Sequence, residues 1–237
     1  MKQRTPPLWN TLTGRVALVF LYLSLISLYP GLNAPWGTIH SVAIPLDSHI
    51  PLATIFVVPY LFFFFPWIAV LLLWSIRNNP TSFGRLIMAL MIGTAISYLF
   101  YFLFQTVVYR DGVPGEGAFS DLVRWVYQSD ARYNAFPSTH TVTTVILLVT
   151  TLPLIRRKAL SVGLISIALS IILSTLFIKQ HNIADLALGV LVAGISLWVA
   201  HRIVPSRLAK PELRKIRETA IPRGSPRRGS KRALSRR

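Results

Sequence analysis

The feature that most constrains this chain is its long apolar blocks. Residues 57–74 read VVPYLFFFFPWIAVLLLW, and comparable blocks recur along the 237 residues. About 20 apolar residues in a helix are enough to cross the hydrocarbon core of a bilayer. Only 14% of the residues are charged, whereas soluble domains have about 25%. The sequence therefore predicts a protein that crosses a membrane several times.

Six segments are predicted to span the membrane, which makes the expected fold an all-α, six-helix transmembrane bundle. They cover approximately residues 16–29, 50–76, 86–108, 138–155, 159–178 and 183–204. The first is short and could be a signal peptide, but no A-x-A-like cleavage pattern follows it, which favours a retained anchor. Pro59 and Pro66 predict kinks in the second. The expected organisation is an N-terminal segment at 1–15, a catalytic membrane domain at 16–204 and a tail at 205–237.

The distribution of Lys and Arg predicts the orientation of these spans. If the N-terminus is cytoplasmic, 21 basic residues lie on the cytoplasmic side and 4 on the other. Basic residues are enriched in cytoplasmic loops, so both termini are expected in the cytoplasm. His140, His181 and Asp185 then lie at or near the extracytoplasmic face, where the active site is expected.

The C-terminal region carries much of the positive charge. Residues 202–237 contain 13 of the 25 Lys and Arg residues, together with several Pro and Gly and little apolar content. This composition is typical of a disordered tail that contacts anionic lipid headgroups. No aromatic pattern or fold motif accompanies the charge, so nucleic acid is not an expected partner. The chain has no Cys, which excludes disulfides, thiolate metal sites and Cys nucleophiles.

The stretch NAFPSTHTV at 134–142 begins the fourth span with reactive side chains. Pro137 suits a helix start and Ser138 can cap it. A helix N-terminus offers free N–H groups and the positive end of the helix dipole, which suit a phosphate. His140 would lie in the first turn, and Arg110 follows the third span at the same membrane face.

The stretch STLFIKQHNIAD at 174–185 supplies a second set of candidates. If the last span is helical from about His181, that residue and Asp185 share a helix face at i, i+4. The carboxylate can then hold the imidazole in one tautomer. Two imidazoles can divide the work of phosphoryl transfer, one attacking phosphorus and the other protonating the leaving oxygen. Arg110 and Lys179 can stabilise the phosphoryl charge.

This chemistry requires no metal and no cofactor, and none is expected. A zinc site built from His140, His181 and Asp185 is an alternative, but it would leave the Ser, Arg and Lys residues without a role. A transporter is a weaker alternative, since the sequence has no repeat symmetry and no paired broken helices.

These residues resemble the type 2 phosphatidic acid phosphatase superfamily over roughly residues 15–204. The family pattern contains K-x6-R-P, P-S-G-H and S-R-x5-H-x3-D, and the last two are similar to residues 137–140 and 174–185. The stretch LDSHIPLATIFVVPY at 46–60 and the KQH at 179–181 are similar to the branch that includes inositol phosphorylceramide synthases. Four positions depart from the pattern: Leu103 for Lys, Asp111 for Pro, Thr139 for Gly and Thr175 for Arg.

The resemblance implies a role for each candidate. His181 would be the nucleophile that forms a phosphohistidine, Asp185 would orient it, and His140 would be the general acid. Phosphate would be bound by Ser138, Thr139 and Arg110, with Lys179 as a substitute for the missing basic residues.

The function expected from this resemblance is hydrolysis of lipid phosphate monoesters, such as phosphatidic-acid-like, isoprenoid or sphingoid phosphates. One alternative is a phosphotransferase that moves a phospho-headgroup between lipids. A second is a non-catalytic membrane protein on the same scaffold. The segment from Arg110 to Ala135 has amphipathic helical spacing, and it either covers the site or forms an ordinary interfacial helix.

Overall fold

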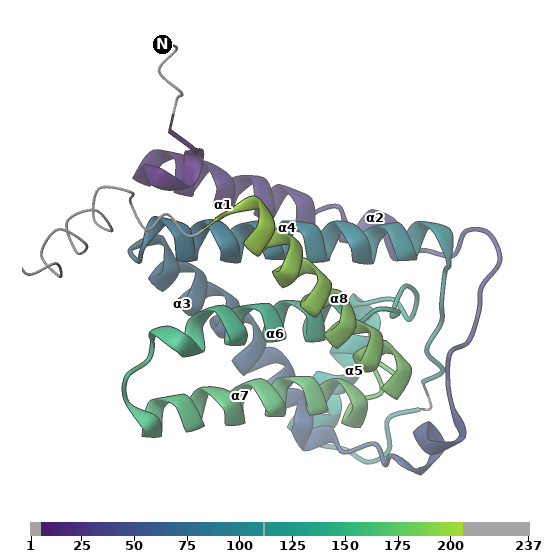
Figure 1. Cartoon of the computed structure of the whole chain (residues 1–237). Helices are drawn as coiled ribbons and strands as arrows, with labels where there is room; N and C mark the ends of the chain where they lie inside the picture. The colour runs from purple at the N-terminus through teal and green to yellow at the C-terminus, as the bar shows by residue number, and fades with distance from the viewer. Residues whose placement is uncertain (1–5, 111, 206–237) are drawn as a thin grey trace, which may run out of the picture. The chain divides into compact units, whose positions relative to one another are not determined.

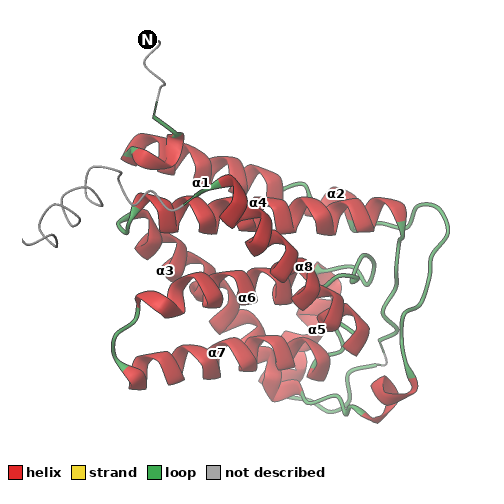
Figure 2. Cartoon of the chain, in the orientation of Figure 1, coloured by secondary structure: helices red, strands yellow, loops and turns green. Residues whose placement is uncertain are grey.

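The computed structural model describes residues 6–110 and 112–205. Within these ranges the chain forms helices joined by loops, with no strand (Figures 1 and 2). The all-α class is confirmed for this part of the chain. Residues 1–5, Asp111 and the basic tail from 206 onward lie outside the described residues.

The α-helices follow one another with loops of very different length. They are α1 (Leu12–Ile26), α2 (Tyr29–Leu32), α3 (Phe64–Ile76), α4 (Pro80–Leu103), α5 (Ala118–Ser129), α6 (Thr139–Thr151), α7 (Lys158–Phe177) and α8 (Ile183–Ile203). Short helical turns accompany them: η1 (Leu8–Asn10), η2 (Pro45–His49), η3 (Thr54–Phe56), η4 (Pro59–Phe63) and η5 (Leu152–Leu154).

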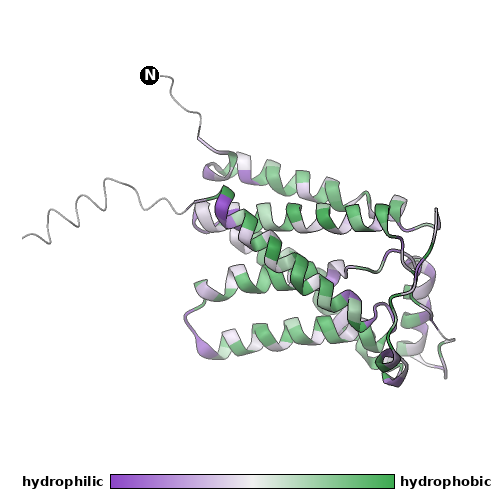
Figure 3. Ribbon diagram, turned by 45° about the vertical axis from the view of Figure 1, so that its right-hand side comes forward, coloured by the Kyte–Doolittle hydropathy of each residue, from purple (hydrophilic) through white to green (hydrophobic). Residues whose placement is uncertain are grey.

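In the described part of the chain, five helical segments are long and apolar enough to cross a membrane, as expected of a multi-pass membrane protein. They are Leu12–Leu32, Thr54–Ile76, Pro80–Leu103, Lys158–Phe177 and Ile183–Ile203. The segment Thr139–Leu154 is apolar but shorter, so the predicted count of six spans depends on this helix. Apolar residues cover the long helices, and hydrophilic residues gather at the helix ends and loops (Figure 3).

Helix α4 begins and ends several residues before its predicted bounds. Asn79 caps it through its side-chain oxygen, which accepts a hydrogen bond from the Thr81 N–H at 2.8 Å, and Pro80 occupies the first helical position. The helix ends at Leu103 because the following residues pair with other loops. The N–H of Val107 donates to the His40 carbonyl, and that of Val108 donates to the Arg132 carbonyl, both at 3.0 Å.

The prolines in the second span shape its beginning. Pro59 opens a turn of π-helix over 59–63, and Pro66 lies in the first turn of α3. A π-turn is a local widening that re-aims side chains, and Pro is tolerated where the N–H has no helical acceptor. The segment thus begins with an irregular turn and continues as regular α-helix. Tyr60, in the irregular turn, is buried.

Helix α6 packs against four others, α3, α4, α7 and α8. Its buried residues Ile146 and Leu147 join the main apolar core with α4 residues such as Phe83 and Leu90. Close approach is permitted by a glycine in α4, since a Cβ at Gly93 would lie 2.7 Å from the Val142 side chain. Small residues allow transmembrane helices to pack tightly. The helix that begins with the PSTH stretch is therefore held on several sides.

Candidate active site

The first turn of α6 has the geometry of an anion site. The Oγ of Ser138 accepts a hydrogen bond from the Thr141 N–H at 3.3 Å, so the predicted cap is confirmed. The N–H groups of Thr139 and His140, in the same turn, have no acceptor within the helix. Ser138 is fully buried, and its hydroxyl serves the helix rather than lining the cavity described below.

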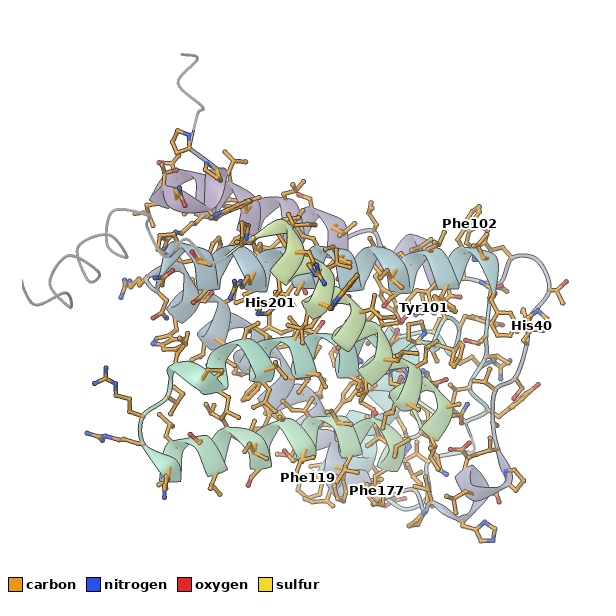
Figure 4. The ribbon with its side chains drawn as sticks, in the orientation of Figure 1. His40, Tyr101, Phe102, Phe119, Phe177 and His201 are labelled. Atoms are coloured by element: carbon orange, nitrogen blue, oxygen red, sulfur yellow. The ribbon has the colours of Figure 1, made fainter. Side chains whose placement is uncertain are left out.

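The loop before α6 is anchored by both neighbouring helices. The Tyr101 hydroxyl, near the end of α4 (Figure 4), donates to the Pro137 carbonyl at 2.7 Å. The Ser138 N–H donates to the Asp185 carbonyl at 3.0 Å. These bonds fix the start of α6 relative to α4 and α8.

Two histidines and an aspartate form a line of contacts at this end of the bundle. The Nε2 of His181 lies 3.4 Å from the Nδ1 of His140, and the Nδ1 of His181 lies 3.4 Å from the Asp185 Oδ2. Asp185 is completely buried and His181 is 8% exposed. Both separations exceed those of strong charged hydrogen bonds, about 2.7–2.9 Å, and catalytic contacts commonly tighten when substrate binds.

His181 lies outside the helix that carries Asp185, which corrects the expectation of an i, i+4 pair within one helix. Helix α8 begins at Ile183, and Asn182 is its N-cap. The pair still meets because the Asp185 carboxylate folds back toward the helix start, where its Oδ2 accepts the Asn182 N–H at 2.7 Å. The same carboxylate thus caps the helix and faces the imidazole.

Asp47 is a further buried carboxylate, which packs at the start of α8 and was not among the predicted site residues. Its Oδ1 accepts the Ile183 N–H and its Oδ2 accepts the Ile44 N–H, both at 2.8 Å. It therefore fastens the η2 turn to the residues that follow His181. The only sequence signal for Asp47 was its place in the LDSHIP stretch.

Arg110 lines a small cavity with the two histidines, but much of its guanidinium is already bound. It donates to the Asp130 carbonyl at 2.7 Å, the Ala131 carbonyl at 3.3 Å and the Gln180 Oε1 at 2.6 Å. These use three of its five N–H donors, and its Nε has no hydrogen-bond partner within the described chain. Burial lowers the pKa of Arg110 and the charge of Asp130 opposes that effect.

Lys179 is not brought to the histidines. Its ammonium donates to the Ile50 carbonyl at 2.5 Å and to the Asp47 carbonyl at 3.0 Å. Its backbone is in the left-handed region, with φ of 54°, which turns the chain sharply between α7 and His181. The side chain thus joins this turn to the η2 loop, and it does not line the cavity with Arg110.

A small polar cavity lies between the two histidines and the segment that leads to α6. Its lining includes residues that sequence reasoning missed, Gln180 and Arg132, as well as the predicted Arg110, Thr139, His140 and His181. The Nε2 of Gln180 is buried and has no hydrogen-bond partner in the described chain. The sequence carried only a weak sign of Gln180, its place in the KQH stretch, and none of Arg132.

A much larger apolar groove of about 670 Å³ adjoins this cavity. It lies between α1 and α3, is backed by α4 and α6, and ends under α5. Four residues line both the groove and the polar cavity: Tyr29, Asp130, Thr139 and His140. The groove and the polar cavity therefore share a wall that includes His140.

The rings of Tyr60 and Phe64 lie against His140. Their centroids are 4.8 Å and 4.3 Å from that of the imidazole. Both rings also line the groove. The start of the second span thus supplies one apolar wall beside the His140 imidazole. The Nδ1 of His140 is in contact with His181.

Helix α5 lies at one end of the groove. Its Val123 and Val126 are buried in a small apolar cluster with Val57 and Ile178. Trp125 and Val126 line the groove, and the Tyr127 hydroxyl donates to the Ile178 carbonyl at 2.9 Å. Helix α5, within the segment expected either to cover the site or to lie at the membrane interface, therefore lines the groove beside His140.

The arrangement of acidic and histidine side chains bears on the zinc alternative. Among the described residues, no three His, Cys, Asp or Glu side chains are grouped so that they could hold a metal ion. The set His140, His181 and Asp185 is thus a line of contacts, with the carboxylate and His140 on opposite sides of His181.

A sequence model of the PAP2 superfamily matches residues 117–209. The match runs from α5 through α8 and contains His140, His181 and Asp185, while Arg110 and Asp47 lie before it. No curated protein matches the chain, and no solved structure matches it. The similarity to the inositol phosphorylceramide synthase branch stays a prediction.

Proposed function

We propose that the protein is a multi-pass membrane phosphatase that hydrolyses lipid phosphate monoesters through a phosphohistidine on His181. The observation that carries this proposal is the line from Asp185 through His181 to His140, next to an apolar groove that His140 also lines. The match to the PAP2 superfamily supports phosphatase or phosphotransferase chemistry.

In the first step, His181 attacks phosphorus through Nε2. Asp185 faces the other ring nitrogen, so it favours the tautomer with a proton on Nδ1 and a lone pair on Nε2. The bond between phosphorus and the lipid oxygen breaks, and His140 gives its proton to that oxygen. The products are the lipid alcohol and phosphohistidine.

In the second step, water attacks the phosphohistidine. His140, which lost its proton in the first step, accepts one from the water, and the bond between phosphorus and His181 breaks to release inorganic phosphate. Each histidine returns to its starting protonation state. The residues of the chain therefore complete the cycle by proton transfer and one covalent intermediate.

The phosphoryl charge is stabilised by donors around the polar cavity. The free N–H groups of Thr139 and His140 lie at the positive end of the α6 dipole. Arg110 and Arg132 supply positive charge, and the unpartnered amide of Gln180 supplies a further donor. In this proposal Gln180 and Arg132 replace the basic residues absent from the family pattern, and Lys179 has a structural role.

The groove accommodates the hydrocarbon chain of the substrate. Its α3 wall is formed by residues recurring along one helix face from Phe64 to Leu73, a length of about 14 Å at about 1.5 Å per residue. Burial of an alkyl chain is favourable by about 0.8 kcal/mol per CH₂. A lipid could thus place its phosphate at the histidines while its chain stays among apolar side chains.

We also propose that both termini are cytoplasmic and that the site opens on the extracytoplasmic face. The bias of Lys and Arg toward the loops at the other end of the helices supports this orientation. His201 lies toward the end of α8 opposite to the site (Figure 4), and the basic tail follows that helix.

The test is phosphate release by the purified full-length chain in detergent, with and without a chelator of divalent cations. We expect His181→Ala to lower the rate by about 10³-fold or more and His140→Ala by about 10²- to 10⁴-fold. His201→Ala is the matched control, since this exposed histidine lies in the last turn of α8, whereas Asp185 lies in the first. Rapid mixing with labelled substrate should give an acid-labile phosphoprotein that His181→Ala lacks. Unchanged phosphate release in both site variants would contradict the histidine mechanism, and no release by the wild-type protein would leave the non-catalytic alternative.

A phosphotransferase shares the first step, and a lipid alcohol then replaces water in the second. The sequence stretches similar to inositol phosphorylceramide synthases favour this second candidate. Labelled lipid phosphate incubated with an acceptor lipid distinguishes the two: hydrolysis yields only inorganic phosphate, whereas transfer yields a new labelled lipid.

A further inference from the structure

Asp130 lies where the apolar groove and the polar cavity meet. It follows α5 and lines both spaces, together with Tyr29, Thr139 and His140. A lipid with its chain in the groove and its phosphate at the histidines has its connecting carbons at this junction. Asp130 is therefore next to the part of the substrate that distinguishes one class of lipid phosphate from another.

The hydrogen bonds within the protein use one of the two carboxylate oxygens of Asp130. The Tyr29 hydroxyl donates to Oδ1 at 3.1 Å, and the Asn33 amide donates to the same oxygen at 2.6 Å. Within the described ranges, Oδ2 accepts no hydrogen bond. An Asn at this position could accept both bonds through its single oxygen, so these contacts do not require a carboxylate.

The negative charge of Asp130 has no ion-pair partner close by. Within the described chain, no Lys, Arg or His nitrogen lies within 4.0 Å of its carboxylate, and Arg110 binds its main-chain carbonyl instead. Burial raises the pKa of this carboxyl, although the positive charge of Arg110 partly opposes the shift. A carboxylate in this position disfavours a nearby phosphate, and a substrate that offers it a donor offsets that cost.

We propose that Asp130 determines substrate specificity by accepting a hydrogen bond, through Oδ2, from a hydroxyl or ammonium group close to the phosphate ester of the lipid. This rests on the proposed function. The preferred substrates are lipid phosphates with such a donor one or two carbons from the ester, as in sphingoid base phosphates or lysophosphatidate. Simple alkyl and isoprenoid phosphates lack the donor and are disfavoured.

The experiment compares three single-chain substrates of equal chain length with purified full-length protein. Sphinganine 1-phosphate offers an ammonium and a hydroxyl, an alkyl glycerol phosphate offers a hydroxyl, and octadecyl phosphate offers neither. Asp130→Asn keeps an oxygen for Tyr29 and Asn33 but loses the charge and the second acceptor. We expect its kcat/KM to fall about tenfold for donor-bearing substrates and to be unchanged or higher for octadecyl phosphate. The ammonium and hydroxyl arms show which donor is recognised.

The control is Asp121→Asn, because Asp121 is an exposed carboxylate of α5 that pairs with Arg124 at 2.5 Å and lines neither space. Equal changes for all three substrates, or no change for any, would overturn the role of Asp130. If wild-type protein releases no phosphate from any of them, the proposed function fails.

A measurement of binding separates these two failures. Thermal unfolding with sphinganine, the alkyl glycerol or octadecanol probes the same contact without catalysis. We expect sphinganine and the glycerol to raise the midpoint of the wild-type protein more than octadecanol does, and Asp130→Asn to lose the difference. Equal midpoint shifts for wild type and variant would contradict the proposed contact.

Discussion

The Nε2 of His181 lies 3.4 Å from the Nδ1 of His140, although 41 residues separate them along the chain. The first precedes α8 and the second lies in the first turn of α6. The hydrogen bond from the Ser138 N–H to the Asp185 carbonyl joins the starts of these two helices. The meeting of the two imidazoles is therefore a product of helix packing.

Asp185→Asn should lower kcat by about 10²-fold or more, because a neutral amide cannot stabilise the positive charge that develops on the His181 ring. The amide oxygen can still accept the Asn182 N–H, so the thermal midpoint should change little. Phosphate release and thermal unfolding check the two expectations, with Asp121→Asn as the control. A kcat equal to that of wild type would mean that Asp185 only caps the helix.

Lys179→Met should affect stability more than phosphate affinity. The ammonium is held by two carbonyls of the 47–50 segment, and loss of bonds to a charged donor costs about 1–3 kcal/mol. Denaturant unfolding should detect this loss, and Lys158→Met, at an exposed position, serves as the control. A raised KM with unchanged stability would instead support the phosphate-binding role expected from the sequence.

Gln180→Ala should raise KM by about tenfold, because the buried amide is proposed to donate to a phosphoryl oxygen. Arg132→Ala should raise it too, and more strongly at low ionic strength, because Arg132 is exposed and its charge is screened by salt. Arg156→Ala, an exposed arginine between α6 and α7, is the control. Steady-state kinetics at two salt concentrations checks both variants, and unchanged KM values would remove these residues from the phosphate site.

Ala69→Trp should shorten the hydrocarbon chain that the enzyme prefers. Ala69 is an exposed residue of α3 that lines the groove, so the indole would occupy space for the chain without disturbing the core. We expect kcat/KM to fall about tenfold for octadecyl phosphate relative to octyl phosphate. Val70→Trp is the control, because Val70 is 61% exposed and does not line the groove. An equal response of both substrates would argue against a chain in this groove.

Local signals in the sequence were enough to predict where α6 begins and how it is capped. Proline, a capping Ser and an apolar run act within one turn, so Ser138 and Thr139 lie where the pattern indicated. The all-α class followed from the apolar blocks. The C-terminal end of α4 was less predictable, because it depends on backbone hydrogen bonds that residues 107 and 108 make with distant loops.

The surroundings of His181 depended on contacts between remote segments. Lys179 meets a carbonyl 132 residues away in sequence, and no local pattern predicts that contact. Gln180 and Arg132 join the site through turns whose direction is fixed by packing. The spacing of His181 and Asp185 predicted that they would pair on one helix face. They instead come into contact because the Asp185 side chain turns back to cap the start of α8.

The close contact between α6 and α8 limits how the site can open. A Cβ at Gly189 would lie 2.9 Å from the Thr141 Cβ and 3.0 Å from the Ser138 carbonyl oxygen, so these helices touch with almost no side chain between them. Widening the gap between the histidines by separating the helices would break this contact and the bond from Ser138 to Asp185. We therefore expect a ligand to reach the histidines without separation of α6 from α8, through movement of side chains or of the loops that surround the site.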